Sequence, residues 1–152
     1  MAKSNHLDAD ADADAPKILR IIDVNLNRLR EALRVIEEYF RFLSLDEPVA
    51  SAVKLLRHSL ERIEADFGAS SLIASRDTKS DPFASVNKPE ELARSTPRQL
   101  LAANLKRSQE AARVIEEYAK ISRHRRASGT AKALRFSLYD FEKDIMERHT
   151  HE

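Results

Sequence analysis

The chain has 152 residues, a formal net charge of +1, no cysteine and two glycines. This length suits one domain with a substantial hydrophobic core, and the lack of cysteine excludes disulfides, thiolate catalysis and cysteine-bound zinc. The near-neutral charge predicts no nucleic-acid partner. Because neither a signal-peptide pattern nor an apolar run of bilayer length occurs, we expect a cytoplasmic protein with no membrane contact.

The first part of the chain predicts an acidic tail followed by a helical hairpin. Residues 1–16 contain an Asp-Ala alternation that cannot bury a core, so we expect a disordered acidic tail there. Apolar residues at helical spacing predict a helix that ends near Leu43 and a second from about Val49 to Phe67. This first hairpin spans residues 17–67.

The rest of the chain predicts a long linker and a second hairpin, residues 99–149, which complete a single helical domain, 17–149. The linker holds three of the five prolines, and its length is typical of a functional or disordered connection. The predicted linker spans residues 68–98 and includes a short helix near Pro89–Ala93. The second hairpin is predicted as a helix from Thr96-Pro97 to near Ile121, a basic turn at Ser122–Gly129 and a helix from about Thr130 to His149.

The two hairpins repeat one another in sequence. NLNRLREALRVIEEY, which starts at Asn25, returns 79 residues later as NLKRSQEAARVIEEY, which starts at Asn104. KLLRHSL at Lys54 returns 78 residues later as KALRFSL at Lys132. Matches of this length indicate internal duplication. The sequence therefore predicts an all-α four-helix bundle made of two duplicated αα-hairpins with pseudo-twofold symmetry.

Polar residues interrupt the apolar stripe of the duplicated helix at the same places in both copies. Such groups cost free energy when buried unless they find partners. One interpretation is a satisfied polar network that sets the register of the hairpins. The other is a cleft between the halves in which the arginines hold an anion. The residues concerned are Asn25, Arg28 and Glu31 and their mates Asn104, Arg107 and Glu110.

Further arginines and two carboxylates could contribute to such a site. Arg57 and Arg135 flank the apolar seam of the second helix in each hairpin, and Arg76 lies in the linker. A guanidinium fork matches the oxygens of phosphate or carboxylate. Asp77 and Asp81 of the linker could hold a magnesium-nucleotide, while the alternative for Asp77 is an Asx-type turn or a bridge to Arg76.

Four segments together carry a family resemblance: ILRIIDVNLNRLREALRVIEEYFRF, ASRDT, LLAANLKRSQEAARVIEEYAKI and KALRFSLYDFEKDI. Over residues 17–147 the chain resembles the hydroxymethylpyrimidine phosphate kinase domain that is fused ahead of thiamine phosphate synthase in some bacteria. That domain is unrelated to the ribokinase-fold pyrimidine kinase. The resemblance implies transfer of the γ-phosphoryl group of ATP to 4-amino-5-hydroxymethyl-2-methylpyrimidine phosphate. A synthase barrel needs about 200 residues or more, so the resemblance covers the kinase domain alone and leaves open whether the protein works by itself or with a separate thiamine phosphate synthase as partner.

Phosphoryl transfer depends mostly on positioning and charge neutralisation. The acceptor is already a phosphate, so it needs cationic shielding rather than a strong general base. The predicted catalytic residues are therefore Arg28, Arg107 and Asp77. The predicted roles are phosphate binding by Arg28, Arg107, Arg57, Arg135 and Arg76, orientation by Asn25 and Asn104, support of the arginines by Glu31 and Glu110, and binding of Mg²⁺ and ATP by Asp77, Thr78 and Asp81.

Two other functions fit the same residues. An all-helical enzyme of the chorismate mutase type would use buried arginines for an anionic substrate and would need no nucleotide. A non-enzymatic helical interaction module would use the polar network only to set register. ATP dependence separates these alternatives, and a homo-oligomer is compatible with each of them.

Overall fold

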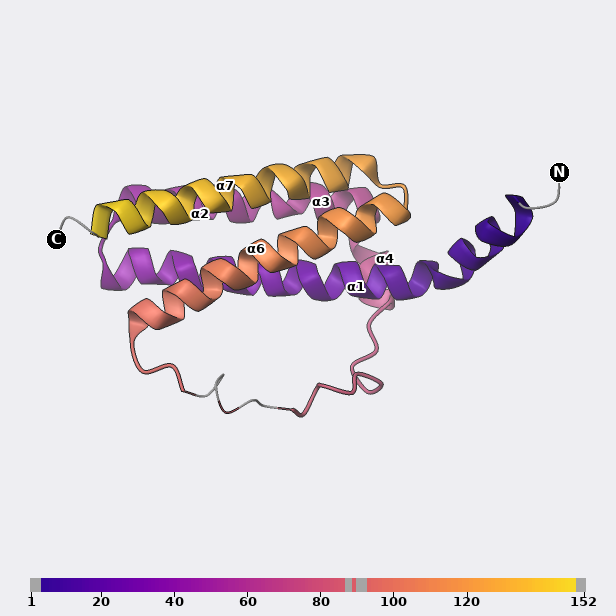
Figure 1. The fold of residues 1–152 in the computed structure, drawn as a ribbon, viewed down its shortest axis with the longest axis horizontal. Helices are drawn as coiled ribbons and strands as arrows, with labels where there is room; N and C mark the ends of the chain where they lie inside the picture. The colour runs from indigo at the N-terminus through magenta and orange to yellow at the C-terminus, as the bar shows by residue number, and fades with distance from the viewer. Residues whose placement is uncertain (1–3, 87–88, 90–92, 150–152) are drawn as a thin grey trace.

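The computed structural model describes residues 4–86, 89 and 93–149, and this part of the chain contains helices and loops without strands. Figure 1 shows the long helices lying alongside one another, with the linker looping away from them after α4. The described helices are α1 (Ser4–Glu38), the π-helix η1 (Tyr39–Leu43), α2 (Glu47–His58), α3 (Leu60–Phe67), α4 (Ala69–Ala74), α6 (Pro97–Ile121) and α7 (Arg125–His149).

Two hairpins build the bundle. The first pairs α1 with α2 and α3, and the second pairs α6 with α7. The duplicated helices α1 and α6 pack extensively on each other, and α3 packs on α7. In Figure 1, α1 and α6 cross on one side of the molecule while α7 lies along α2 and α3 on the other. The predicted all-α bundle of two duplicated hairpins is confirmed.

The apolar stripe of the duplicated helix forms the centre of the core, as its spacing predicts. Burying one Leu or Ile side chain stabilises a fold by about 1.5–3 kcal/mol, so this seam contributes much of the folding free energy. The buried stripe includes Ile22, Leu29, Leu33 and Ile36 of α1 and, at the equivalent positions of α6, Leu101, Ser108, Ala112 and Ile115.

The first helix begins earlier than the sequence predicts. α1 runs from Ser4 through Pro16, so residues 4–16 are helical where the Asp-Ala alternation predicts a disordered tail; residues 1–3 of that tail lie outside the described residues. Alanine has the highest helix propensity, and alanines alternate with the aspartates in this stretch. Figure 1 shows the first turns of α1 angled away from the bundle, as expected when a proline removes a helical hydrogen bond.

Side-chain hydrogen bonds set several helix boundaries. Thr96 Oγ1 accepts a hydrogen bond from the Gln99 amide at 3.2 Å, which starts α6 where the sequence predicts. Asp46 caps α2 in the same way, so α2 begins at Glu47 rather than at Val49. Ser59 Oγ donates to the Leu56 carbonyl at 2.6 Å. This bond lies at the break between α2 and α3, which the sequence predicts as one helix.

The basic turn between α6 and α7 is shorter than predicted. α7 begins at Arg125, so the connection is only Ser122–His124, and Gly129 lies within α7 instead of in the turn. Arg123 adopts a positive φ of 63°, a left-handed conformation that lets the chain reverse over few residues.

The linker is attached to the bundle at its start. α4, which the sequence does not predict, places Leu72 in the core and packs against α1. The short helix predicted near Pro89–Ala93 lies largely outside the described residues. None of the helices in the described part of the chain is long and apolar enough to cross a membrane.

Candidate functional site

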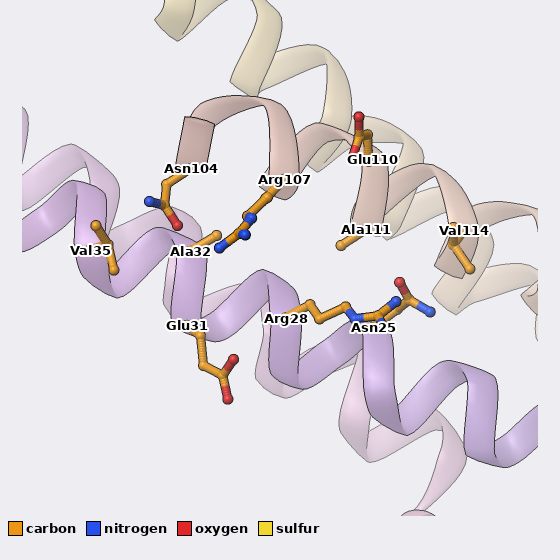
Figure 2. A pocket seen from close by; sticks show the side chains of 10 residues that line it. All are labelled: Asn25, Arg28, Glu31, Ala32, Val35, Asn104, Arg107, Glu110, Ala111 and Val114. Atoms are coloured by element: carbon orange, nitrogen blue, oxygen red, sulfur yellow. The ribbon is translucent and has the colours of Figure 1, made fainter. Parts of the chain in front are cut away.

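A hollow of about 730 Å³, the central cleft, opens where α1 packs on α6. Each residue that α1 contributes to this cleft has its repeat mate, 79 positions later in the sequence, on the opposite wall (Figure 2). The cleft therefore lies on the pseudo-twofold axis of the bundle. The paired lining residues are Asn25 and Asn104, Arg28 and Arg107, Glu31 and Glu110, Ala32 and Ala111, and Val35 and Val114.

The two helices run in opposite directions along the central cleft. In Figure 2, Asn25 and Asn104 lie toward opposite ends of the cleft, whereas Arg28 and Arg107 extend into the space between the helices. The structure thus brings together two of the arginines that the sequence predicts as phosphate ligands.

Arg28 and Arg107 are exposed, and within the described residues neither guanidinium has a hydrogen-bond or ion-pair partner. By contrast, Arg30 pairs with Glu64 at 2.9 Å. Two cations on opposite walls of one hollow favour a ligand with negative charge on both sides, because guanidinium groups bind phosphate or carboxylate oxygens strongly.

The two cleft asparagines are buried and are oriented in the same way. Asn25 Nδ2 donates to the Ile21 carbonyl, and Asn104 Nδ2 donates to the Leu100 carbonyl, each at 2.8 Å. Because only the amide nitrogen can donate to a carbonyl, these bonds fix the side-chain orientation. Each Oδ1 is left on the cleft side, as Figure 2 shows. The asparagines therefore add two acceptors to the two arginine forks.

The two cleft glutamates do not support the arginines as the sequence analysis expects. Figure 2 shows Glu31 and Glu110 pointing outward, away from Arg28 and Arg107. Both carboxylates are exposed, and in the part of the chain that the structure describes no ion pair joins them to either arginine. The arginine side chains extend between the helices, whereas the glutamates reach into solvent at the rim of the cleft.

Arg57 and Arg135 do not line the central cleft. This corrects the prediction that they bind phosphate in one site together with Arg28 and Arg107. Arg57 Nε pairs with Glu37 at 3.0 Å, and Arg135 Nη2 pairs with Glu116 at 2.9 Å. Both glutamates are only 3% exposed, because α2 and α7 cover a side of α1 and α6 that the helical wheel treats as polar. A hydrogen bond to the Tyr139 hydroxyl, together with Glu116, raises the pKa of Arg135. These duplicated pairs form a structural network.

A second hollow of about 470 Å³, the linker pocket, lies where the linker returns to α1. Arg76 closes it by donating two hydrogen bonds to Asp23, at 2.6 and 3.0 Å, and Asp23 is 4% exposed. These bonds raise the pKa of Arg76 and occupy a group predicted to bind phosphate. The linker pocket is lined by Arg20, Asp23, Val24 and Asn27 of α1 and by Arg76, Asp77, Thr78, Ser80, Asp81 and Pro82 of the linker.

Asp77 forms the Asx-type turn that the sequence analysis gives as one alternative. Its carboxylate accepts hydrogen bonds from the hydroxyl and from the backbone amide of Ser80. These bonds, with a smaller contribution from Arg20, lower the pKa of Asp77. The expected bridge to Arg76 does not form, because Arg76 is bound to Asp23, and Arg20 lies 3.6 Å from Asp77 instead.

Asp77 and Asp81 both line the linker pocket, as the magnesium prediction requires. Within residues 4–86, 89 and 93–149 no group of three or more His, Cys, Asp or Glu could hold a metal ion. Magnesium is commonly held by one or two carboxylates together with substrate phosphates. The two aspartates therefore fit a metal bound jointly with a nucleotide, and they do not form a complete protein site.

Sequence reasoning missed the residues of α1 that build the linker pocket. Arg20, Asp23 and Asn27 lie three and four positions apart, so they share one face of the helix. That spacing of charged and amide side chains is a signal that could have found them. The helix repeat does not reveal them, because their positions in the second copy hold different residues.

The fold and the central cleft define a duplicated helical-bundle protein with paired arginines on its symmetry axis. The chain belongs to the ThiD2 family, whose sequence model matches residues 20–144. The resemblance to a domain associated with thiamine phosphate synthase is therefore confirmed at the level of the family.

Similar curated proteins carry the name thiamine-phosphate synthase. The protein from Thermosynechococcus vestitus is 42% identical over 133 residues, which cover 88% of this chain and 36% of the relative. The protein from Nostoc sp. is 38% identical over 135 residues, which cover 89% of this chain and 37% of the relative. The protein from Gloeobacter violaceus is 41% identical over 125 residues, which cover 82% of this chain and 35% of the relative. The chain thus spans little more than a third of these relatives. No solved structure is significantly similar to it.

Proposed function

We propose that the protein is a thiamine-biosynthesis kinase that transfers the γ-phosphoryl group of ATP to the phosphate of 4-amino-5-hydroxymethyl-2-methylpyrimidine phosphate. The observation that carries the proposal is the central cleft, where Arg28 and Arg107 extend into one space and have no hydrogen-bond or ion-pair partner among the described residues. Membership of the ThiD2 family and the relatives named thiamine-phosphate synthase support a role in thiamine biosynthesis. A thiamine-phosphate synthase is the proposed partner that consumes the diphosphate product.

The proposed reaction joins two anions, so the main barrier that the protein lowers is electrostatic. An oxygen of the acceptor phosphate forms a bond to the γ-phosphorus, the bond from the γ-phosphorus to the β–γ bridging oxygen breaks, and ADP leaves with that electron pair. The acceptor phosphate is largely ionised near neutral pH and needs no strong base. Arg28 and Arg107 neutralise the oxygens on the two sides, as guanidinium groups do in phosphoryl transfer.

The remaining cleft and pocket residues position the reactants. Asn25 and Asn104 present their Oδ1 atoms to donor groups of the substrates, or orient the arginine forks. Asp77, Asp81 and Thr78 border the nucleotide, and the hydrogen bonds from Ser80 lower the pKa of Asp77. When Mg²⁺ is bound with the nucleotide, it neutralises charge on the phosphates.

The proposal is tested by a coupled assay of the purified protein with Mg-ATP and the pyrimidine phosphate. We expect one ADP released for each diphosphate formed, and no product without ATP. Replacement of both arginines, Arg28→Ala with Arg107→Ala, should abolish turnover and leave helical content unchanged, because both side chains are exposed and neither is paired within the part of the chain that the structure describes.

A matched control for this assay is Arg98→Ala, an exposed arginine on α6 that lines neither hollow. Full activity in the double variant would overturn the proposal. Lack of turnover by the folded wild-type protein, with both substrates present, would also overturn it and would favour the helical interaction module. Conversion of an anionic substrate without nucleotide would favour the chorismate mutase type of chemistry.

A further inference from the structure

The linker pocket adjoins the central cleft on one side of the molecule only. Asn27, which lines the pocket, and Arg28, which lines the cleft, are consecutive residues of α1, so their Cα atoms are about 3.8 Å apart. The two hollows therefore border adjoining faces of the same helical turn.

The residues of α1 that line the pocket are absent from the second copy of the repeat. The equivalents of Arg20, Asp23, Val24 and Asn27 on α6 are Gln99, Ala102, Ala103 and Lys106. Lys106 is exposed and pairs with Glu142 at 3.2 Å. The residues of the two cleft walls are thus duplicated, whereas the pocket-lining residues of α1 occur in only one of the two halves.

Asn27 has a fixed orientation and unused hydrogen-bonding capacity. Arg30 donates to Asn27 Oδ1 at 2.8 Å, and Arg30 is itself held by Glu64 at 2.9 Å. The amide nitrogen of Asn27 therefore lies on the side away from Arg30, and within the described residues it has no hydrogen-bond partner. Its two N–H groups and the second lone pair of Oδ1 remain available to a ligand.

A primary amide with free donor and acceptor atoms pairs in bidentate fashion with an amino-substituted nitrogen heterocycle. The exocyclic amine donates to Oδ1, and the neighbouring ring nitrogen accepts from Nδ2, as in the recognition of adenine by asparagine. The pocket also offers apolar surface at Val24 and Pro82 for the face of a ring. Its volume of about 470 Å³ lies within the range of small-molecule sites, roughly 300–1,000 Å³.

We infer that the linker pocket binds the amino-heterocycle of one phosphorylated substrate through Asn27 and directs its phosphate to Arg28, leaving Arg107 for the other substrate. This inference rests on the proposed function. Asn27 is then a specificity-determining residue that breaks the symmetry of the cleft. Adenine and the 4-aminopyrimidine share the required edge, so the experiment distinguishes these two sources.

Binding is measured by isothermal titration calorimetry with three probes: ADP, the pyrimidine phosphate and inorganic diphosphate. Asn27→Asp is the main variant, because it keeps the acceptor for Arg30 and the side-chain shape while removing the amide donor. Asn27→Leu is the second variant. Lys106→Leu is the matched control, since Lys106 occupies the equivalent position on α6.

We expect both Asn27 variants to weaken the binding of one heterocyclic probe by roughly tenfold or more, with diphosphate binding unchanged. Loss of ADP binding alone would assign the pocket to the nucleotide, and loss of pyrimidine phosphate binding alone would assign it to the acceptor. Lys106→Leu should change neither. Unchanged binding of all probes in both Asn27 variants, or an equal loss that includes diphosphate, would overturn the inference.

The kinase assay separates this inference from the proposed function. A selective loss of one probe in a protein that lacks phosphoryl transfer would uphold the pocket and overturn the kinase. Turnover by the wild-type protein together with unaltered binding in the Asn27 variants would uphold the kinase and overturn the pocket.

Discussion

The central cleft and the linker pocket differ in symmetry and in the state of their charges. Every lining residue of the cleft has a repeat mate, and its two arginines have no protein partner among the described residues. The linker pocket is built against α1 alone, and its arginines are already paired, Arg76 with Asp23 and Arg20 with Asp77.

In the proposed kinase, this difference would divide two tasks between the cleft and the pocket. Duplication of a helix places the same anion-binding group on both walls of a cleft, which suits reactants that share a phosphate. It cannot by itself distinguish two different reactants, because both halves present the same chemistry. A segment that occurs once, the linker, supplies the asymmetry.

The largest expected effect concerns the duplicated buried ion pairs and tests whether they stabilise the fold. Glu116→Ala should lower the free energy of unfolding by about 3–5 kcal/mol, because it leaves the charge of Arg135 uncompensated in a mostly buried site. Urea unfolding followed by circular dichroism measures the loss. Glu117→Ala is the neighbouring control, since Glu117 is half-exposed and should shift the midpoint little. Equal losses in the two variants would contradict a structural role for the buried pair.

The second-largest expected effect tests whether the two arginines of the cleft contribute equally to activity. Arg28→Ala and Arg107→Ala should each lower kcat/KM by about 10²- to 10³-fold, because each removes one charged donor from the transferring phosphates. Neither should change the urea midpoint, since both side chains are exposed. Steady-state kinetics on the two single variants provide the comparison. A large loss in one variant and none in the other would show that the cleft is symmetric in form but not in function.

A smaller and local effect is expected in the linker pocket. Asp23→Ala removes the carboxylate that holds Arg76, so amide hydrogen exchange in residues 75–82 should become about tenfold faster. Exchange in α6 should remain as in the wild type. Asp14→Ala, which removes only an exposed pair with Lys17, is the control. Unchanged exchange in the linker of the Asp23 variant would show that Arg76 does not anchor it.

The smallest effect concerns the charge state of Asp77. Ser80→Ala removes the main cause of its lowered pKa, so the pKa should rise toward the ordinary aspartate value of about 3.9. A group with a lowered pKa contributes stability above its unfolded pKa and loses it as the pH falls through its folded pKa. The stability difference between wild type and variant should therefore be present at neutral pH and shrink in acid. A carbon NMR titration of the Asp77 carboxyl group reports the shift, and an unchanged pKa would mean that Ser80 does not set it.

The fold class, the duplication and the arginine pair on the repeated helix could all be predicted from the sequence alone. These depend on local periodicity and on residue identities that recur at a constant spacing, both of which can be read without coordinates. The sequence was also sufficient to predict where α6 begins, because a Thr-Pro cap acts on the first turn of its own helix. The sequence did not predict the helical conformation of residues 4–16, where the helix propensity of alanine extends α1 into the expected disordered tail.

The packing of the helices against one another was needed to show which arginines face the cleft. A helical wheel places residues around a single axis, but it does not show where a second helix covers that surface. α2 and α7 bury Glu37 and Glu116, and the buried carboxylates bind Arg57 and Arg135. Arg28 and Arg107 remain available because α1 and α6 meet on the opposite side of their own axes, where no carboxylate of the described residues reaches them.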